Sequence, residues 1–213
     1  MSYARLSLVF ASLLFTNACA AVTLAPDQTE KHSANLREPA LVRVLPDSVH
    51  SFERRGYKYF NDGSGYSIRY ANERKQRMAD LYIYQVADEN ASLDHEQLVL
   101  GSTRATMDAI SDAAQKGHYA NFNVVDAVTH SQGVRTIARV QATYLRQNLA
   151  SYTLVYQTEH KGTLLKVRVT MPDNDSNRNS DEWDRFTDIV FKAVIDDIDS
   201  PELAAANEQI PDL

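Results

Sequence analysis

The chain has 213 residues, 44% of them hydrophobic and 23% charged, and a formal net charge of −6. This length and composition are typical of one globular domain with a hydrophobic core of its own. The only cysteine is Cys19. A single cysteine excludes an internal disulfide and argues against a structural zinc site, because such sites are built mainly on cysteine ligands.

The first 20 residues have the pattern of a secretory signal peptide. Arg5 supplies a positive charge, an apolar run follows over 6–15, and small residues lead to Ala20. The run is too short for a membrane helix, which needs about 20 apolar residues, and its layout matches a leader that is removed on export. We therefore expect an exported, periplasmic protein, and export disfavours a nucleic-acid partner.

Two cleavage sites are compatible with this leader. Residues 18–20 form an Ala-x-Ala site, where cleavage before Ala21 would remove the sulfur. Alternatively, Cys19 resembles the acylated cysteine of bacterial lipoproteins, whose leaders end in a Leu-small-small-Cys box, although Thr16 and Asn17 depart from that box. Cys19 is therefore a lipidation candidate, and both mature starts stay open.

The remainder of the chain divides into three parts. Residues 21–55 are polar and contain three prolines, which predicts a flexible tether with at most an edge strand at 41–45. A single domain is expected over 56–198. No Lys or Arg follows Lys192, whereas six acidic residues do, so that 199–213 is predicted to be a disordered acidic tail.

Within the domain, apolar and polar residues alternate in short segments that predict strands. The predicted strands are 57–60, 66–70, 80–86, 121–128, 134–145, 152–157 and 163–171. One helix is predicted between an N-cap at Ser92 and the pair Lys116-Gly117, with a buried stripe that begins at Leu100. A second helix is predicted from Ser180 to Ile198.

The order of these elements is hairpin, strand, helix, antiparallel meander and helix. Short turns between most strands make the sheet antiparallel. The expected fold class is therefore α+β, with an antiparallel sheet of about six to seven strands packed against two main helices.

In this element order the chain resembles the PsbP-like superfamily, which includes bacterial envelope lipoproteins of the DcrB type. The resemblance covers residues 56–198 and is carried by the strand Tyr66-Ser-Ile-Arg-Tyr70 and by the closing helix with Trp183 and Phe186. It implies a sheet packed against helices, and a binding or accessory role rather than an enzyme. No functional motif is shared that can be transferred.

The sequence contains no recognisable catalytic or metal-binding motif. The six histidines lack the i, i+4 spacing of a zinc-binding helix; they are His32, His50, His95, His118, His130 and His160. Ser64 lies between two glycines of a predicted hairpin turn, which is not a nucleophile elbow. We therefore expect no catalytic residue, no cofactor and no metal.

Two groups of side chains are candidates for binding. Six of the eleven tyrosines fall within the first three strands, at Tyr57, Tyr59, Tyr66, Tyr70, Tyr82 and Tyr84. Tyrosine favours strands and stabilises cross-strand pairs, so that sheet packing is the simpler interpretation. The functional alternative is an aromatic floor for a glycan or a partner, because tyrosine combines an apolar ring with a polar tip.

The second group is basic. Arg135 and Arg139 alternate on one predicted strand, and Lys166 and Arg168 alternate on another. If both faces coincide with that of Arg69, they form an exposed basic stripe that suits anionic lipid heads, glycan phosphates or an acidic segment. Solvated surface charge is the simpler interpretation.

These observations predict an exported cell-envelope binding or accessory module without enzymatic activity, either soluble in the periplasm or tethered through Cys19. Its partner would be an envelope protein or an anionic or glycan ligand. The alternative is a periplasmic small-ligand or glycan-binding protein that uses the tyrosine-rich hairpin. A small hydrolase that uses Ser64 and His130 is a more distant alternative.

Overall fold

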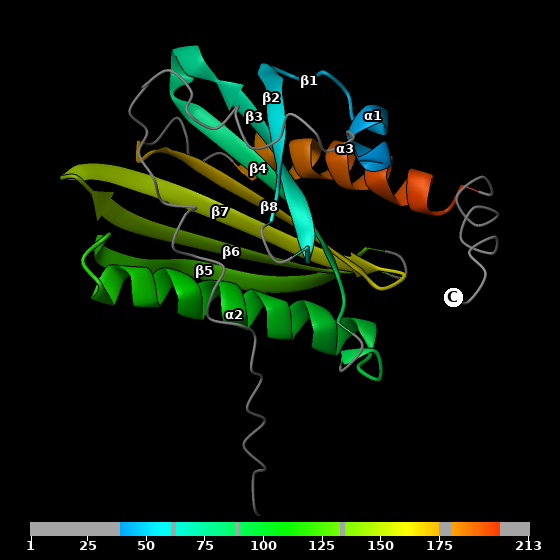
Figure 1. Cartoon of the computed structure of the whole chain (residues 1–213). Coiled ribbons are helices and arrows are strands. Elements are labelled where there is room, and N and C mark those ends of the chain that lie inside the picture. The colour runs from blue at the N-terminus through cyan, green and yellow to red at the C-terminus, as the bar shows by residue number, and fades with distance from the viewer. Residues whose placement is uncertain (1–38, 61–62, 88–89, 133–134, 175–179, 201–213) are drawn as a thin grey trace, which may run out of the picture.

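The structure, a computed structural model, describes residues 39–200 except for 61–62, 88–89, 133–134 and 175–179 (Figure 1). The predicted leader, with Cys19, and most of the predicted acidic tail lie outside the described residues. In chain order the elements are α1 (Ala40–Val44), β1 (Ser48–Val49), β2 (Phe52–Tyr59), β3 (Gly65–Asn72), the 3₁₀ helix η2 (Glu73–Lys75), β4 (Arg77–Gln85), α2 (His95–Gln115), β5 (Ala120–Gln132), β6 (Arg135–Arg146), β7 (Leu149–His160), β8 (Thr163–Pro172) and α3 (Ser180–Ile198).

The strands form one antiparallel sheet in the order β1-β2-β3-β4-β8-β7-β6-β5. The α+β class, the antiparallel sheet and the two main helices agree with the sequence-based expectation. The sheet has eight strands rather than six to seven. The additional strand, β1, has two residues, too few for a period of two to appear in the sequence.

Residues 39–55, the described part of the predicted tether, belong to the folded body, which corrects two expectations. Residues 41–45 were expected as an edge strand, but α1 occupies this position. Val42 of α1 and Leu45, the extended residue that follows the helix, are both buried in the core. Phe52, at the start of β2, is 1% exposed, so the core extends into the predicted tether.

The main core lies between the sheet and α3 (Figure 1). Phe52 contacts Trp183 and Phe186 with ring centroids 5.0 and 5.5 Å apart. Tyr70 packs edge-on against Phe186 and donates a hydrogen bond from its hydroxyl to the carbonyl of Pro46 at 2.9 Å. Aromatic pairs at these separations stabilise a core beyond the area that they bury.

The second long helix, α2, packs against β5, β6 and β7. Its N-cap is Asp94, not Ser92: the Asp94 side chain accepts from the Gln97 amide, and the Gln97 side chain accepts from the Asp94 amide. This capping box fixes the start of the helix. Ile110 is buried, as the predicted stripe required, whereas Leu100 is 43% exposed, so the buried stripe begins at Leu98 and Val99 rather than at Leu100.

α2 and α3 cover opposite faces of the sheet. In β7, the side chain of Gln157 hydrogen-bonds Ser102 and Thr106 of α2, whereas the adjacent Tyr156 donates to Asp184 of α3. Neighbouring residues of a strand point to opposite faces. Because α2 packs on the β5–β7 end, no helix of the described residues covers the same face over β2, β3, β4 and β8. We call this region the open half-face.

The turn between β2 and β3 requires glycine, as the sequence predicted. Gly63 and Gly65 have φ angles of 73° and 156°. A Cβ atom at Gly65 would lie 2.0 Å from the carbonyl oxygen of Ile83 in β4. The turn is therefore limited to glycine by the close approach of β4 as well as by its backbone angles.

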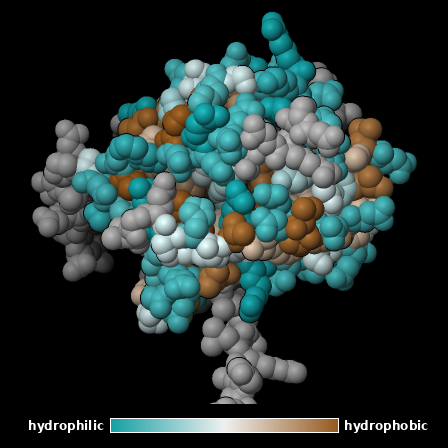
Figure 2. Space-filling view, turned by 180° about the vertical axis from the view of Figure 1, so that it is seen from behind, coloured by the Kyte–Doolittle hydropathy of each residue, from teal (hydrophilic) through white to brown (hydrophobic). Residues whose placement is uncertain are grey.

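At the other end of the sheet, β5 is the edge strand. Its pairing with β6 is interrupted by two irregularities, between Ala120 and Asn123 and between Val124 and Asp126. Val124, Val125 and Val128 are at least 37% exposed. Figure 2 shows the back of the molecule, where hydrophobic side chains lie in small separate groups among hydrophilic ones. Among the described residues, no helix is long and apolar enough to span a membrane.

Phe52→Ala tests whether the core extends into the predicted tether. Because Phe52 is buried against Trp183 and Phe186, we expect a loss of about 3–5 kcal/mol in the free energy of unfolding, measured by urea denaturation with Trp183 fluorescence. Leu149→Ala is the control, since Leu149 is 70% exposed, and should change stability by less than about 0.5 kcal/mol. Equal effects of the two substitutions would contradict the assignment.

Candidate functional site: an aromatic and basic surface on the open half-face

The open half-face carries a cluster of rings and cations from β4, β8 and the end of β2. Tyr82 of β4 lies directly opposite Lys166 of β8. Residues two positions further along each strand point to the same face, so Tyr84 and Arg168 belong to the cluster. Phe60, which follows β2, contacts both tyrosine rings. We call these five residues the aromatic–basic surface.

Its three rings are nearly parallel. The rings of Tyr82 and Tyr84 are inclined by 2° with centroids 6.2 Å apart. Phe60 stacks on both, at 6.3 Å from Tyr82 and 5.2 Å from Tyr84, with an inclination of 21° to each. All three residues are half-buried, so that part of each ring is accessible beside a fixed neighbour.

Lys166 is the buried charge beneath these rings. Its Nζ lies 4.5 Å from the ring centroid of Tyr82 and 5.1 Å from that of Tyr84, which places it within range of a cation–π interaction with both. Lys166 is 7% exposed. Burial, together with the nearby charge of Arg168, lowers the pKa of Lys166 from 10.5 to about 7.

Arg168 extends the positive charge toward the end of α2. Its side chain hydrogen-bonds Tyr119, which packs on Tyr144 with ring centroids 4.5 Å apart. The Nε atom of Arg168 is buried and has no hydrogen-bond partner among the described residues. Two cations two residues apart on one strand give this surface a positive potential while Lys166 is protonated.

Arg69 shares the open half-face but its charge is neutralised. Its Nε and Nη2 donate to the two carboxylate oxygens of Asp80 at 2.7 and 3.3 Å. This bidentate pair has the geometry of a strong arginine–carboxylate interaction. Arg69 therefore borders the aromatic–basic surface as an ion pair rather than as a free cation.

The other four candidate tyrosines lie on the opposite face. Tyr70 is fully buried in the core. Tyr57 and Tyr66 pack against the same core, and Tyr59 contacts both, with ring centroids 5.9 and 5.8 Å apart. The six tyrosines are thus divided between the two faces and do not form a single aromatic floor.

The basic candidates are divided in the same way. Lys166 and Arg168 share a face with Arg69, as the stripe required. Arg139 points to the opposite face, where it lies 3.5 Å from a carboxylate oxygen of Asp126 and 3.7 Å from one of Asp184. Arg135, four residues earlier on β6, points to that face too. One stripe of all five cations is therefore not formed.

The hydrolase alternative gains no support from the geometry. Ser64 adjoins β3, and His130 lies on β5, so that four strands separate the two residues in the sheet. His130 is on the edge strand rather than in the predicted turn. Among the described residues, no group of three or more His, Cys, Asp and Glu side chains is placed to hold a metal ion.

One interaction between distant residues was not predicted from the sequence. His95, at the start of α2, lies with Nδ1 2.7 Å from the Glu159 carboxylate, and its Nε2 accepts a hydrogen bond from the Thr136 amide at 2.7 Å. Glu159 also accepts from the Gly162 amide at 2.6 Å. The contacts join α2 to β6, β7 and the β7–β8 turn. Because 64 residues separate His95 from Glu159, no local pattern indicates the pair.

Lys166→Met tests the buried charge. In the folded state Lys166 loses its proton near pH 7, whereas the unfolded chain keeps it up to about pH 10.5. The unfolded state therefore binds more protons in this window, and stability should rise with pH. From pH 6 to 10 we expect the free energy of unfolding of the unsubstituted protein to gain on the order of a few kcal/mol relative to Lys166→Met. The free energies of unfolding are measured by chemical denaturation at each pH. If they change equally with pH in the unsubstituted protein and in Lys166→Met, Lys166 is not the buried charge.

No protein-family model and no curated protein matches this sequence. Solved structures do match at low identity. Cyanobacterial PsbP (CyanoP) from Synechocystis sp. PCC 6803 is 11% identical, with a TM-score of 0.41, over 68% of this chain and 91% of that protein. The Pseudomonas aeruginosa protein PA94 is 10% identical, with a TM-score of 0.38, over 67% and 85%. The Ran-binding protein Mog1p of Saccharomyces cerevisiae is 9% identical, with a TM-score of 0.32, over 68% and 92%. One of these structures is a PsbP protein, which is the family that the element order resembles; at these identities and TM-scores no site or activity is transferred.

Proposed function

We propose that this protein is an exported binding module of the cell envelope, without catalytic activity of its own, and that it binds its partner through the aromatic–basic surface. The observation that carries the proposal is the parallel arrangement of Phe60, Tyr82 and Tyr84 above Lys166 on the open half-face. Partly accessible aromatic rings of this kind are enriched in binding interfaces, where each ring contributes a large contact area at a low entropy cost.

The groups of this surface suit recognition, because the flat rings supply contact area and the cations supply positive charge. Its polar groups are phenol hydroxyls and cations, and its five residues include neither a carboxylate nor a histidine. General acid–base catalysis near neutral pH is most often performed by those two groups. Binding through flat rings with a buried cation needs neither of them.

A glycan is the second candidate ligand. The observation that favours it is the row of nearly parallel rings, because sugar rings present flat apolar faces that stack on aromatic side chains. The tyrosine hydroxyls would supply polar contacts at the edge of the same rings. A protein partner would use the same rings as apolar anchors.

Site-specific photo-cross-linking tests the proposal. A benzophenone amino acid in place of Tyr84 should give a cross-linked adduct when the protein is expressed in the envelope of its native host. The matched control is the same replacement at Tyr59, which belongs to the same hairpin region but to the opposite face, and it should give none. Peptides of a second protein in the tryptic digest of the adduct, identified by mass spectrometry, indicate a protein partner, and loss of the added mass on treatment with a muramidase indicates a peptidoglycan strand. Equal adducts at both positions, or none at either, would reject this surface as the binding site.

Export is tested by the intact mass of the mature protein purified from its native host. We expect the leader to be absent. A mass that begins at Cys19 and includes acyl chains identifies a lipid-anchored protein, and a mass that begins at Ala21 identifies a soluble periplasmic one. A mature protein that retains Met1 and Arg5 would overturn the proposed location.

A further inference from the structure

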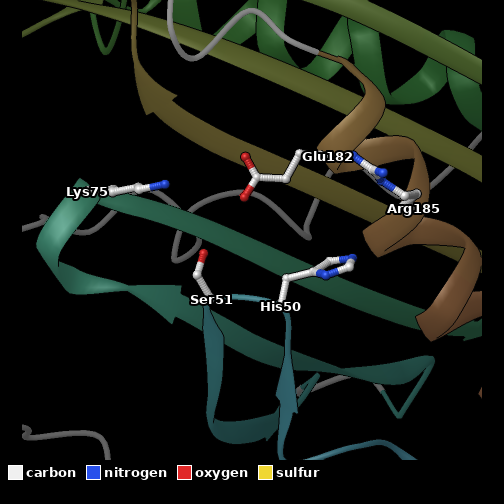
Figure 3. A pocket seen from close by; sticks show the side chains of 5 residues that line it. All are labelled: His50, Ser51, Lys75, Glu182 and Arg185. Carbon is white, nitrogen blue, oxygen red and sulfur yellow. The ribbon is translucent and has the colours of Figure 1, made fainter.

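A cavity of about 500 Å³ lies beside the start of α3 (Figure 3), the helix that covers the face of the sheet opposite the aromatic–basic surface. It is formed where the β1–β2 turn, η2 and the first two turns of α3 meet. Its lining residues are His50, Ser51, Lys75, Glu182 and Arg185. This volume falls in the range of sites that bind small molecules.

Two walls of the cavity are held in place by one buried side chain. Asn72 is 9% exposed. Its Nδ2 donates to Ser51 Oγ at 2.9 Å, and its Oδ1 accepts from the Lys75 amide at 3.1 Å. Asn72 therefore fixes the β1–β2 turn relative to η2. Because Ser51 Oγ is the acceptor in this contact, its O–H hydrogen points elsewhere and can be donated to a ligand.

The single carboxylate of the cavity is already neutralised. Glu182 accepts a hydrogen bond from Arg77 Nη1 at 2.8 Å. Arg77 is 5% exposed and lies over the ring of Trp183, with Cζ 5.8 Å from the ring centroid. A charge pair with one partner this deeply buried is held in a fixed position. Glu182 and Arg77 together thus contribute no net charge to the cavity.

The remaining charges are positive. Lys75 and Arg185 are exposed and form no ion pair within the described part of the chain. Arg185 Nε donates to the backbone carbonyl of Asp181 at 3.2 Å, which leaves its two terminal nitrogens as donors. In Figure 3, Lys75 and Glu182 extend toward the centre from opposite sides, and Ser51 points into the space between them.

We propose that this cavity is a second binding site that takes a small molecule through a phosphate group. Apart from the Glu182 carboxylate, which is paired with Arg77, the polar groups that line it are hydrogen-bond donors from three separate elements: the Ser51 hydroxyl, the His50 ring, the Lys75 ammonium and the Arg185 guanidinium. Donors that converge from several directions match the oxygens of a tetrahedral dianion, and Arg with Lys is the usual pair for phosphate. The cavity is larger than one phosphate group, so the ligand carries an organic body as well.

The test is a titration of the mature protein with sn-glycerol 3-phosphate, followed by ¹H–¹⁵N NMR, with potassium chloride at equal ionic strength as the reference. Signals of residues 50–51 and 73–75 should shift and saturate. Lys75→Gln and Arg185→Gln should each weaken binding at least about tenfold, because each removes a charged hydrogen bond to phosphate. Both side chains are exposed, so the fold should persist, which thermal unfolding checks.

The matched controls remove the same charge elsewhere. Lys161 and Lys192 are exposed and are paired with Asp199 and Asp196. These pairs lie outside the cavity. Lys161→Gln and Lys192→Gln should therefore leave binding within about twofold of the unsubstituted protein. Equal weakening by the control variants, or no saturation up to about 10 mM, a concentration well above that of specific ligands, would overturn the proposal.

A second arm distinguishes the source of the phosphate. Vesicles of phosphatidylcholine with 20% phosphatidic acid, compared with phosphatidylcholine alone, are sedimented with the protein. Binding that depends on Lys75 and Arg185 in this arm identifies a lipid headgroup, and binding only to glycerol phosphate identifies a free organic phosphate. A Tyr84→Ala variant should bind both probes normally, which separates this site from the aromatic–basic surface.

Discussion

The pairing of β4 with β8 is the contact on which the rest of the structure depends. The sheet consists of two consecutive meanders, β1–β4 and β5–β8, which α2 connects in sequence and which only β4 and β8 join side by side. The register of this pair sets Ile83 beside Leu165 on the core face and Tyr82 beside Lys166 on the other. A shift of one residue would exchange these faces, so that the core and the aromatic–basic surface arise from the same register.

The strands and helices that were predictable are those in which the spacing of apolar residues in the sequence matches the face that is buried in the fold. In β8, apolar residues alternate over 165–171 because one face packs on α3, and the strand was predicted almost in full. The segment 41–45 was not, because four apolar residues around Arg43 do not distinguish a short helix from a strand. Its structure is set by packing of α1 against α3. At the candidate site, the tyrosines and Lys166 were identifiable by residue type. The division of these side chains between the two faces was not identifiable, because it depends on which strands pair. Phe60 is part of the site only because β2, β3 and β4 lie side by side in the sheet.

The two proposed sites differ in how they treat positive charge. Lys166 is buried beneath aromatic rings, where removal from water lowers its pKa, whereas Lys75 and Arg185 are exposed around a neutralised Glu182–Arg77 pair. The first arrangement favours contact with flat or weakly charged partners, because a cation with a lowered pKa is only partly charged at neutral pH. The second presents two exposed cations to solvent and favours anions. Their location on opposite sides of one sheet allows both to be occupied together.

The irregular pairing of β5 has a consequence for how this protein behaves at high concentration. An edge strand with exposed valines offers unpaired amides and carbonyls to a second chain, which is the usual start of sheet extension into aggregates. The interruptions near Asn123 and Asp126 bend the strand and break its row of donors and acceptors. A second β5 strand therefore finds an uninterrupted edge only over residues 126–132, so that Val124 and Val125 lie outside the segment that could extend the sheet.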